Sequence, residues 1–243
     1  MIVDSTALPE QAVTNILESA FQSAGQRCSA LRCVYVQDDI AAARTAMLIG
    51  AMQELSLGDP WRISTDIDPV IDAGAKTKIA GHIVTANTEG RVLYAGSPPS
   101  EGHIIAPTLI KASAIAALQY EVFGPVLHIA TFASIDIDNV IKAINATGYD
   151  LTFGLQSRIS NWVADISKRI SAGNIYVNRN QIGAVVGSQP FGGHGLSGTG
   201  PKAGGPLYMN RLQAASDRTT KAVWPHPMPR DLLKAGVNDL GII

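Results

Sequence analysis

The chain has 243 residues, of which 46% are hydrophobic and 16% charged, and its formal net charge is −1. This composition is typical of an ordered globular protein with a sizeable core and excludes a disordered chain. The near-neutral charge, with lysine and arginine dispersed, argues against a nucleic-acid-binding surface.

The cysteine content and the N-terminal sequence indicate in which cellular compartment the protein is expected. The two cysteines cannot form a disulfide framework, and their C-x4-C spacing without a nearby histidine predicts no metal site. The opening "MIVDSTALPEQ" lacks the basic and apolar regions of a signal peptide, and no apolar run approaches the ~20 residues of a membrane span. We therefore expect a cytoplasmic protein with reduced thiols and no membrane span.

Strand and helix patterns alternate along the chain. "MIV" is typical of a strand end, and apolar residues from Val13 to Phe21 recur at helical spacing behind a cap at Asp4 or Ser5. The alternation, with short connections, predicts an α/β domain with an open, mostly parallel sheet flanked by helices. The later elements are expected as strand 33–36, helices 40–55 and 69–90, strands 91–96, 103–112 and 126–132, helix 135–147, strand 153–159, helix 161–171 and strand 173–178.

Beyond Asn178 the chain becomes rich in glycine and loses its periodicity. A long loop of this kind inside a compact protein is usually functional. Gly193, Gly195 and Gly198 spell G-x-G-x-x-G, but no strand precedes them and no helix follows. We therefore reject a dinucleotide-binding fingerprint at this position.

The segment "GQRCSALRC", residues 25–33, contains both cysteines. Cys33 opens an apolar strand and fits an inert buried thiol. Cys28 lies between a helix end and that strand, where Arg27 and local backbone N–H groups favour the reactive thiolate. An inert core cysteine is the alternative. A cysteine hydrolase is less favoured, because the five histidines are scattered and show no pairing with Cys28.

Three motifs together resemble the aldehyde dehydrogenase superfamily. "GQRCSA" resembles its active-site cysteine motif, and "EVFGPV", residues 121–126, is similar to its Glu-x-Phe-Gly-Pro signature. "AGNIYVN" followed by "QPFGGHGLSGTG" resembles its closing strand and glycine-rich loop. The resemblance covers residues 1–211. The loop "NQIGAVVGSQPFGG" and the tail "KAVWPHPMPRDLL" are similar to the glutamate-semialdehyde dehydrogenases, above all the dehydrogenase part of bifunctional bacterial proline-catabolic enzymes.

This resemblance implies NAD-dependent oxidation of L-glutamate γ-semialdehyde to glutamate, through a thiohemiacetal and a thioester on Cys28. It implies that Gly183 and Ala184 anchor the polar end of the substrate and that Ser29 hydrogen-bonds its carboxylate. Phe191 is implied to pack against the aliphatic part of the substrate, and Arg27 is assigned to the same site.

For the cofactor, the resemblance implies that Glu121 binds the nicotinamide ribose hydroxyls and that Phe123 lies beside the nicotinamide. The choice between NAD and NADP stays open. FAD is expected only in the proline dehydrogenase part of a bifunctional parent. In the family, the dinucleotide-binding domain, the oxyanion-hole asparagine and the general-base glutamate all precede the position that Met1 matches.

We therefore expect a catalytic domain over residues 1–200 and an oligomerisation strand with a tail over residues 201–243. The NAD-binding domain is expected to be missing, and the fragment to be inactive alone. The expected partners are a small aldehyde substrate and further copies of the chain, bound through the tail. The alternative is a folding or oligomerisation module without catalysis.

Overall fold

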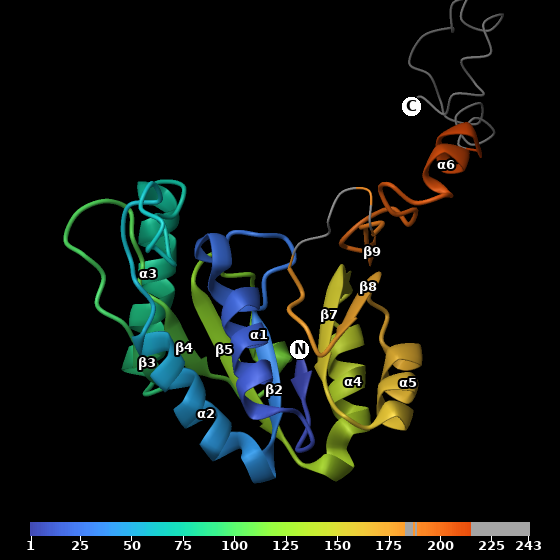
Figure 1. The fold of residues 1–243 in the computed structure, drawn as a ribbon, viewed down its shortest axis with the longest axis horizontal. Helices are drawn as coiled ribbons and strands as arrows, with labels where there is room; N and C mark the ends of the chain where they lie inside the picture. Colours follow the sequence, from blue (N-terminus) through green and yellow to red (C-terminus); the bar gives the residue numbers. More distant parts are fainter. Residues whose placement is uncertain (183–186, 188, 215–243) are drawn as a thin grey trace, which may run out of the picture.

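The computed structural model describes residues 1–182, 187 and 189–214 (Figure 1). Its centre is a seven-stranded sheet in which every neighbouring pair is parallel except β3 and β4 at one edge. The expected open, mostly parallel α/β sheet is confirmed. In spatial order the strands are β3 (Val92–Ala95), β4 (Thr108–Lys111), β5 (Val126–Phe132), β2 (Cys33–Gln37), β1 (Ile2–Val3), β7 (Thr152–Gln156) and β8 (Asn174–Val177).

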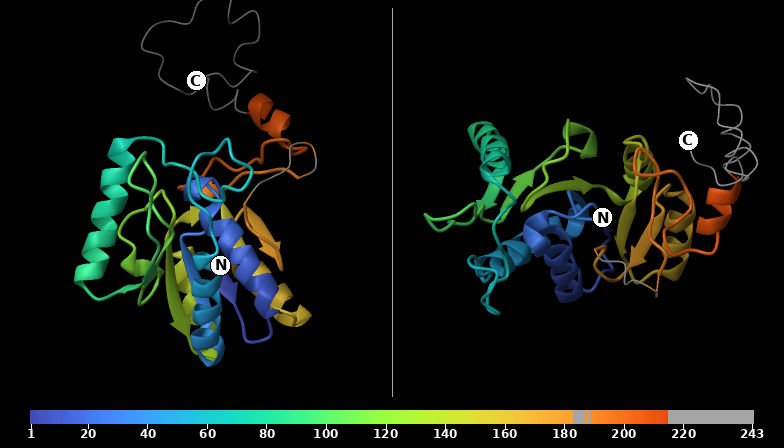
Figure 2. Two further views of the ribbon diagram at one scale, coloured as in Figure 1. Left: turned by 60° about the vertical axis from the view of Figure 1, so that its left-hand side comes forward. Right: turned by 90° about the horizontal axis from the view of Figure 1, so that it is seen from above.

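Helices cover both faces of this sheet (Figure 2). One apolar cluster joins the sheet to α1 (Pro9–Phe21), α2 (Asp38–Gln53) and α3 (Ala73–Thr88). A second cluster joins it to α4 (Ile137–Asn145) and α5 (Ser160–Arg169). The short strand β1 lies between β2 and β7, and Ile2 and Val3 are 0% and 1% exposed. Burial on both faces explains why the central strands have nearly continuous apolar sequences.

Two predicted helix starts are wrong. The first helix begins at Pro9, and its N-cap is Leu8 rather than Asp4 or Ser5. The Asp4 carboxylate does not cap the helix, because it accepts hydrogen bonds from the backbone N–H and the hydroxyl of Thr6, at 2.7 and 2.6 Å. The third helix begins at Ala73 rather than at residue 69. Its cap is Asp72, which accepts from the N–H of Ala75 at 2.7 Å.

Two predicted strands are longer than the observed ones. The pattern over 103–112 yields a strand only over Thr108–Lys111, after Pro107, and the strand expected over 153–159 ends at Gln156. Proline has no N–H to donate to a ladder, so a strand commonly begins after it.

The glycine-rich segment folds back onto the end of the sheet. Its β9 (His194–Gly195) pairs antiparallel with β6 (Tyr149–Asp150), and α6 (Tyr208–Ala214) extends away from the sheet (Figure 1). The tail from residue 215 lies outside the described residues, so the proposed domain division at residue 200 stays a prediction. In the described part of the chain, none of the helices combines the length and the apolar character needed to cross a bilayer.

Candidate active site

The turn that carries Cys28 follows an unusual stretch of backbone. After α1, Ser23, Ala24 and Gly25 have φ angles of 56°, 51° and 65°, all in the left-handed region. Only glycine adopts this region without cost, so two of these residues are strained. The chain is thereby reversed toward β2, and an Ala30 N–H to Arg27 C=O bond of 3.0 Å closes a turn around Cys28.

This turn exposes Cys28 rather than burying it. Within residues 1–182, 187 and 189–214, its backbone N–H has no hydrogen-bond partner. An exposed thiol beside a free N–H can attack a carbonyl carbon and then donate to the oxyanion that forms.

The second motif packs directly against the first. A Cβ placed on Gly25 would lie 2.3 Å from the carbonyl oxygen of Gly124, which belongs to "EVFGPV". A Cβ placed on Gly124 would lie 2.4 Å from a methyl carbon of Ile79 on α3. Glycine is therefore required at position 25 for the two segments to touch, whereas a Cβ on Gly124 would meet the movable end of the Ile79 side chain.

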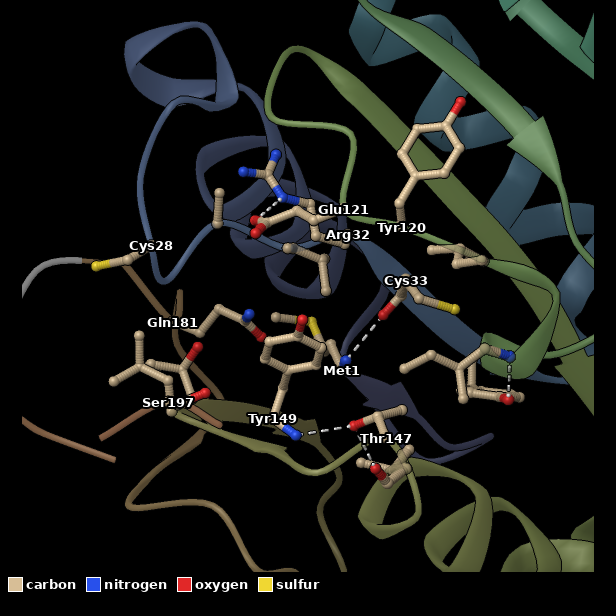
Figure 3. Close-up of a pocket in the computed structure, with 18 of the residues that line it drawn as sticks. Met1, Cys28, Arg32, Cys33, Tyr120, Glu121, Thr147, Tyr149, Gln181 and Ser197 are labelled. Carbon is tan, nitrogen blue, oxygen red and sulfur yellow. Dashed lines mark hydrogen bonds and ion pairs between the residues drawn. The ribbon is translucent and has the colours of Figure 1, made fainter. Parts of the chain in front are cut away.

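A cavity of about 400 Å³ opens between these segments (Figure 3). Its lining includes both Cys28 and Glu121, together with Met1, Arg32, Thr152 and Gln181. In Figure 3, Cys28 lies at the left-hand end of the group of lining residues, and the Arg32–Glu121 pair lies along the upper side, across from Tyr149. Cys28 is thus exposed and lines the same cavity as Glu121, and its role as the nucleophile stays a prediction.

The cavity lies at the amino ends of the strands. Met1, Arg32 and Leu151 line it and immediately precede β1, β2 and β7. Ligands of open α/β sheets usually bind outside the carboxyl ends. The site therefore depends on the connections that enter the strands, which are the two motif segments.

Glu121 and Phe123 both lie against Arg32. The Arg32 Nε donates to Glu121 Oε1 at 2.9 Å, and its guanidinium carbon lies 4.8 Å from the centre of the Phe123 ring. Phe123 is 43% exposed. The predicted cofactor-binding residues therefore share Arg32 as a neighbour, but only Glu121 lines the cavity, and the role of each residue stays a prediction.

The two residues next to Cys28, Arg27 and Ser29, do not line the cavity. Ser29 is 4% exposed, and its carbonyl oxygen accepts from Gln181 Nε2 at 3.2 Å and from Thr152 Oγ1 at 3.5 Å. The Arg27 Nε donates to Ser23 Oγ at 2.9 Å. Neither Arg27 nor Ser29 lines the described cavity, so their assignment to the substrate stays untested.

The remaining predicted substrate residues belong to the loop after β8. Gly183 and Ala184 lie outside the described residues. Phe191 is half-buried and exchanges backbone hydrogen bonds with Ala203 at 3.1 and 2.9 Å. It does not line the described cavity.

Several lining residues were not predicted. Gln181 is 4% exposed and links the loop after β8 to the Cys28 turn through the Ser29 carbonyl. Ser197 enters from the glycine-rich loop, and Tyr149 from β6. Ser197 lies inside the glycine-rich loop, and Gln181 lies in the loop "NQIGAVVGSQPFGG", where only Gly183, Ala184 and Phe191 were expected to contact the substrate. Nothing in the sequence around Tyr149 indicated a site.

The two thiols have different surroundings, and this predicts different reactivity. Burial raises the pKa of Cys33 to about 11, so it stays protonated at neutral pH. We expect iodoacetamide at pH 7.5 to alkylate Cys28 at least ~100-fold faster than Cys33, as followed by peptide mass mapping. Equal rates at the two positions would argue against a displayed nucleophile.

A hydrogen-bonded pair of histidines, His82 and His128, contacts the backbone of Arg32. His128 is 2% exposed, its Nδ1 lies 3.1 Å from the Arg32 carbonyl oxygen, and its Nε2 lies 3.0 Å from the Nε2 of His82. A protonated Nδ1 on His128 donates to that carbonyl, which leaves its Nε2 to accept from His82. Both rings are neutral in this arrangement.

The pair predicts a loss of stability in acid. Burial lowers the pKa of His128 from 6.5 to about 4, and the adjacent His82 ring and the positive charges of Arg91 and Arg32 act in the same direction. Because the folded pKa lies below the unfolded one, the stabilisation is complete above about pH 6.5 and is lost as the pH falls toward 4. We expect His128→Leu to remove about 2 to 3 kcal/mol of the stability difference between pH 7 and pH 4.5 in urea unfolding. An unchanged pH profile in the variant would contradict a neutral buried ring.

No group of three or more histidine, cysteine or acidic side chains in the described residues is arranged to hold a metal ion. The charged and nucleophilic groups that line the described cavity include the Cys28 thiol, the Glu121 carboxylate and the Arg32 guanidinium.

The fold and the site define an α/β domain in which a cysteine thiol and a carboxylate line one cavity. The chain belongs to the aldehyde dehydrogenase family, whose model, described as "Aldehyde dehydrogenase family", matches residues 1–215. This confirms the family that the three sequence motifs predicted.

Relatives and solved structures agree with this family. The chain is 52% identical over 231 residues to the "Bifunctional protein PutA" of Escherichia coli K12, which covers 92% of the chain and 18% of the relative. It is 37% identical over 212 residues to the "1-pyrroline-5-carboxylate dehydrogenase" of Geobacillus thermodenitrificans. That alignment covers 86% of the chain and 41% of the relative. The chain thus spans well under half the length of either relative.

Two solved structures show the same fold. A crystal structure of a bifunctional proline utilization A protein superposes with a TM-score of 0.82 at 50% identity, over 85% of this chain and 21% of that one. A 1-pyrroline-5-carboxylate dehydrogenase from Thermus with bound NAD gives a TM-score of 0.75 at 33% identity, over 82% of this chain and 38% of that one.

Proposed function

We propose that this chain is the thiol-bearing, substrate-binding part of an NAD-dependent dehydrogenase that oxidises L-glutamate γ-semialdehyde to glutamate in proline catabolism. The observation that carries the proposal is that Cys28 and Glu121, distant in sequence, line one cavity. The 1-pyrroline-5-carboxylate dehydrogenases among the relatives support the choice of substrate, because that compound is the cyclic form of the semialdehyde. The free cysteines are consistent with a cytoplasmic location.

The proposed reaction begins at the sulfur of Cys28. The thiolate adds to the aldehyde carbon, which forms a C–S bond and turns the carbonyl oxygen into an oxyanion. The unpartnered N–H of Cys28 can donate to that oxygen. Loss of a hydride from the same carbon gives a thioester, and water then releases the carboxylate and restores the thiol.

NAD supplies the acceptor for the hydride. The chain fits one end of this cofactor, because Glu121 uses only one carboxylate oxygen for Arg32 and its side chain is 49% exposed. The second oxygen can accept from ribose hydroxyls, and the exposed ring of Phe123 offers an apolar surface beside them. FAD has no place in this proposal, since it belongs to the proline-oxidising part of a bifunctional parent.

The hydrolytic step needs a base that we place outside this chain. Glu121 contributes the one carboxylate among the described lining residues, and it is paired with Arg32. Because its Oε1 accepts from the Arg32 Nε at 2.9 Å, we assign this carboxylate to the cofactor rather than to the hydrolytic step. We therefore propose that the general base, an oxyanion-stabilising amide and the NAD-binding domain come from a preceding region of a longer protein, and that the 243-residue chain alone does not turn over.

The substrate contacts remain part of the proposal. Gly183 and Ala184 anchor the polar end of the substrate, Ser29 hydrogen-bonds its carboxylate, and Arg27 belongs to the same substrate site. Phe191 packs against the aliphatic carbons. The tail over residues 201–243 is proposed to carry the contacts between subunits.

A chimera tests this function. In this chimera, the chain is substituted for the aligned segment of the E. coli bifunctional protein, with which it shares 52% identity over 231 residues. We expect the chimera to reduce NAD with glutamate semialdehyde at a rate within ~10-fold of the unmodified protein, and the isolated chain to give no turnover. A folded chimera without activity, or robust turnover by the chain alone, would overturn the proposal.

A further inference from the structure

Arg32 makes more contacts around the cavity than the motifs predicted. Its side chain is only 14% exposed and donates through all three nitrogens. Nε lies 2.9 Å from Glu121 Oε1, Nη1 lies 3.1 Å from the carbonyl oxygen of Gly124, and Nη2 lies 3.4 Å from the carbonyl oxygen of Arg27. One planar group therefore joins the Cys28 turn to the "EVFGPV" segment.

The backbone of Arg32 is itself fixed. Its carbonyl oxygen accepts from the N–H of His128 at 3.0 Å and lies 3.1 Å from the Nδ1 of the same residue. The next residue, Cys33, begins β2 in the middle of the sheet. A side chain that starts from such a rigid point can hold two loops at a set separation.

We propose that Arg32 is a positioning residue that sets the geometry between the thiol of Cys28 and the carboxylate of Glu121. The contact with the Arg27 carbonyl, one residue before Cys28, holds the nucleophile turn. The contact with Glu121 Oε1 fixes that carboxylate so that its second oxygen is left for the cofactor. This inference rests on the proposed dehydrogenase function.

The two kinds of contact have different chemical requirements. A lysine can pair with Glu121, because a point charge suffices for one carboxylate oxygen. It cannot also reach the carbonyl oxygens of Gly124 and Arg27, which lie in the directions of the guanidinium fork. Arg32→Lys therefore removes the contacts to the backbone while it keeps the ion pair, whereas Arg32→Met removes both.

The test measures KM for NAD and kcat for Arg32→Lys and Arg32→Met in the chimera. We expect Arg32→Lys to lower kcat ~10-fold or more and to leave KM for NAD within ~3-fold, while Arg32→Met raises KM for NAD ~10-fold as well. In a Glu121→Ala background, the effect of Arg32→Met on KM for NAD should disappear. Arg169→Met is the matched control, because Arg169 pairs with Asp138 and Asp165 away from the cavity.

A second readout uses the 243-residue chain alone and needs no turnover. We expect Arg32→Met and Arg32→Lys to change the rate of Cys28 alkylation by iodoacetamide by ~5-fold or more, with the rate in Arg169→Met unchanged. Thermal unfolding of each variant separates a positioning effect from loss of fold. Folded Arg32 variants with unaltered alkylation and kinetics would overturn the inference. If the unsubstituted chimera is inactive but alkylation responds to Arg32, the dehydrogenase proposal fails and the positioning of the thiol stands.

Discussion

Replacing Cys28 by alanine in the chimera is expected to lower kcat for semialdehyde oxidation by at least ~10³-fold. The physical reason is that the C–S bond converts a free aldehyde into an alkoxide from which a hydride can leave, and no other described side chain at the cavity is a comparable nucleophile. The only other lining thiol of the described residues, Cys33, is held protonated because burial raises its pKa to about 11. The measurement is the initial rate of NADH formation.

Cys33→Ala is the matched control for this substitution. Cys33 is 4% exposed, and its removal leaves only a small cavity beside β2. We expect the variant to keep kcat within ~3-fold of the unsubstituted chimera. If Cys33→Ala is as inactive as Cys28→Ala, loss of packing rather than loss of the nucleophile explains both.

Gly25→Ala is expected to have the largest effect on stability. The residue has φ of 65°, where a side chain is strained, and the new Cβ would lie 2.3 Å from the carbonyl oxygen of Gly124 and 2.8 Å from that of Ala20. Both neighbours are backbone atoms, which cannot rotate away. We expect urea unfolding of the 243-residue chain to show a loss of about 3 kcal/mol or more.

Gly50→Ala makes the same chemical change, but we expect it to raise the free energy of unfolding rather than lower it. Gly50 lies inside α2, and a Cβ there would meet no atom within 4 Å. Alanine favours a helix over glycine by about 1 kcal/mol, so this variant should gain stability. A Gly25→Ala protein as stable as Gly50→Ala would show that the Cys28 turn does not press against the "EVFGPV" segment.

The order of strands and helices could be predicted from the sequence because hydrophobic periodicity is a local property. Helix starts were less predictable, since they depend on which polar group a side chain finds. Asp4 looked like a cap, but its carboxylate is used by Thr6. Asp72 was included within a predicted helix, yet it is the residue that caps it.

The site was predictable only where a motif marks it. Cys28 and Glu121 belong to short signatures, and the structure places both at one cavity. Arg32 lies just outside the cysteine motif, and Gln181 lies in the loop "NQIGAVVGSQPFGG" but was given no role there, because the importance of both residues depends on contacts with distant segments. Arg32 meets Glu121 and Gly124 across 89 and 92 positions, and Gln181 meets Ser29 across 152. A pattern within one segment contains no information about such partners.

The central claim is that the sulfur of Cys28 bonds to the carbonyl carbon of the substrate. The most direct measurement is to mix the chimera with NAD and glutamate semialdehyde labelled at the aldehyde carbon, quench in acid during the first turnover, and map the tryptic peptides. We expect label on the peptide of residues 28–32, which trypsin releases by cleavage after Arg27 and after Arg32. Hydroxylamine should release that label, as expected of a thioester. Label on a different peptide, or turnover that persists with residue 28 replaced by alanine, would contradict it.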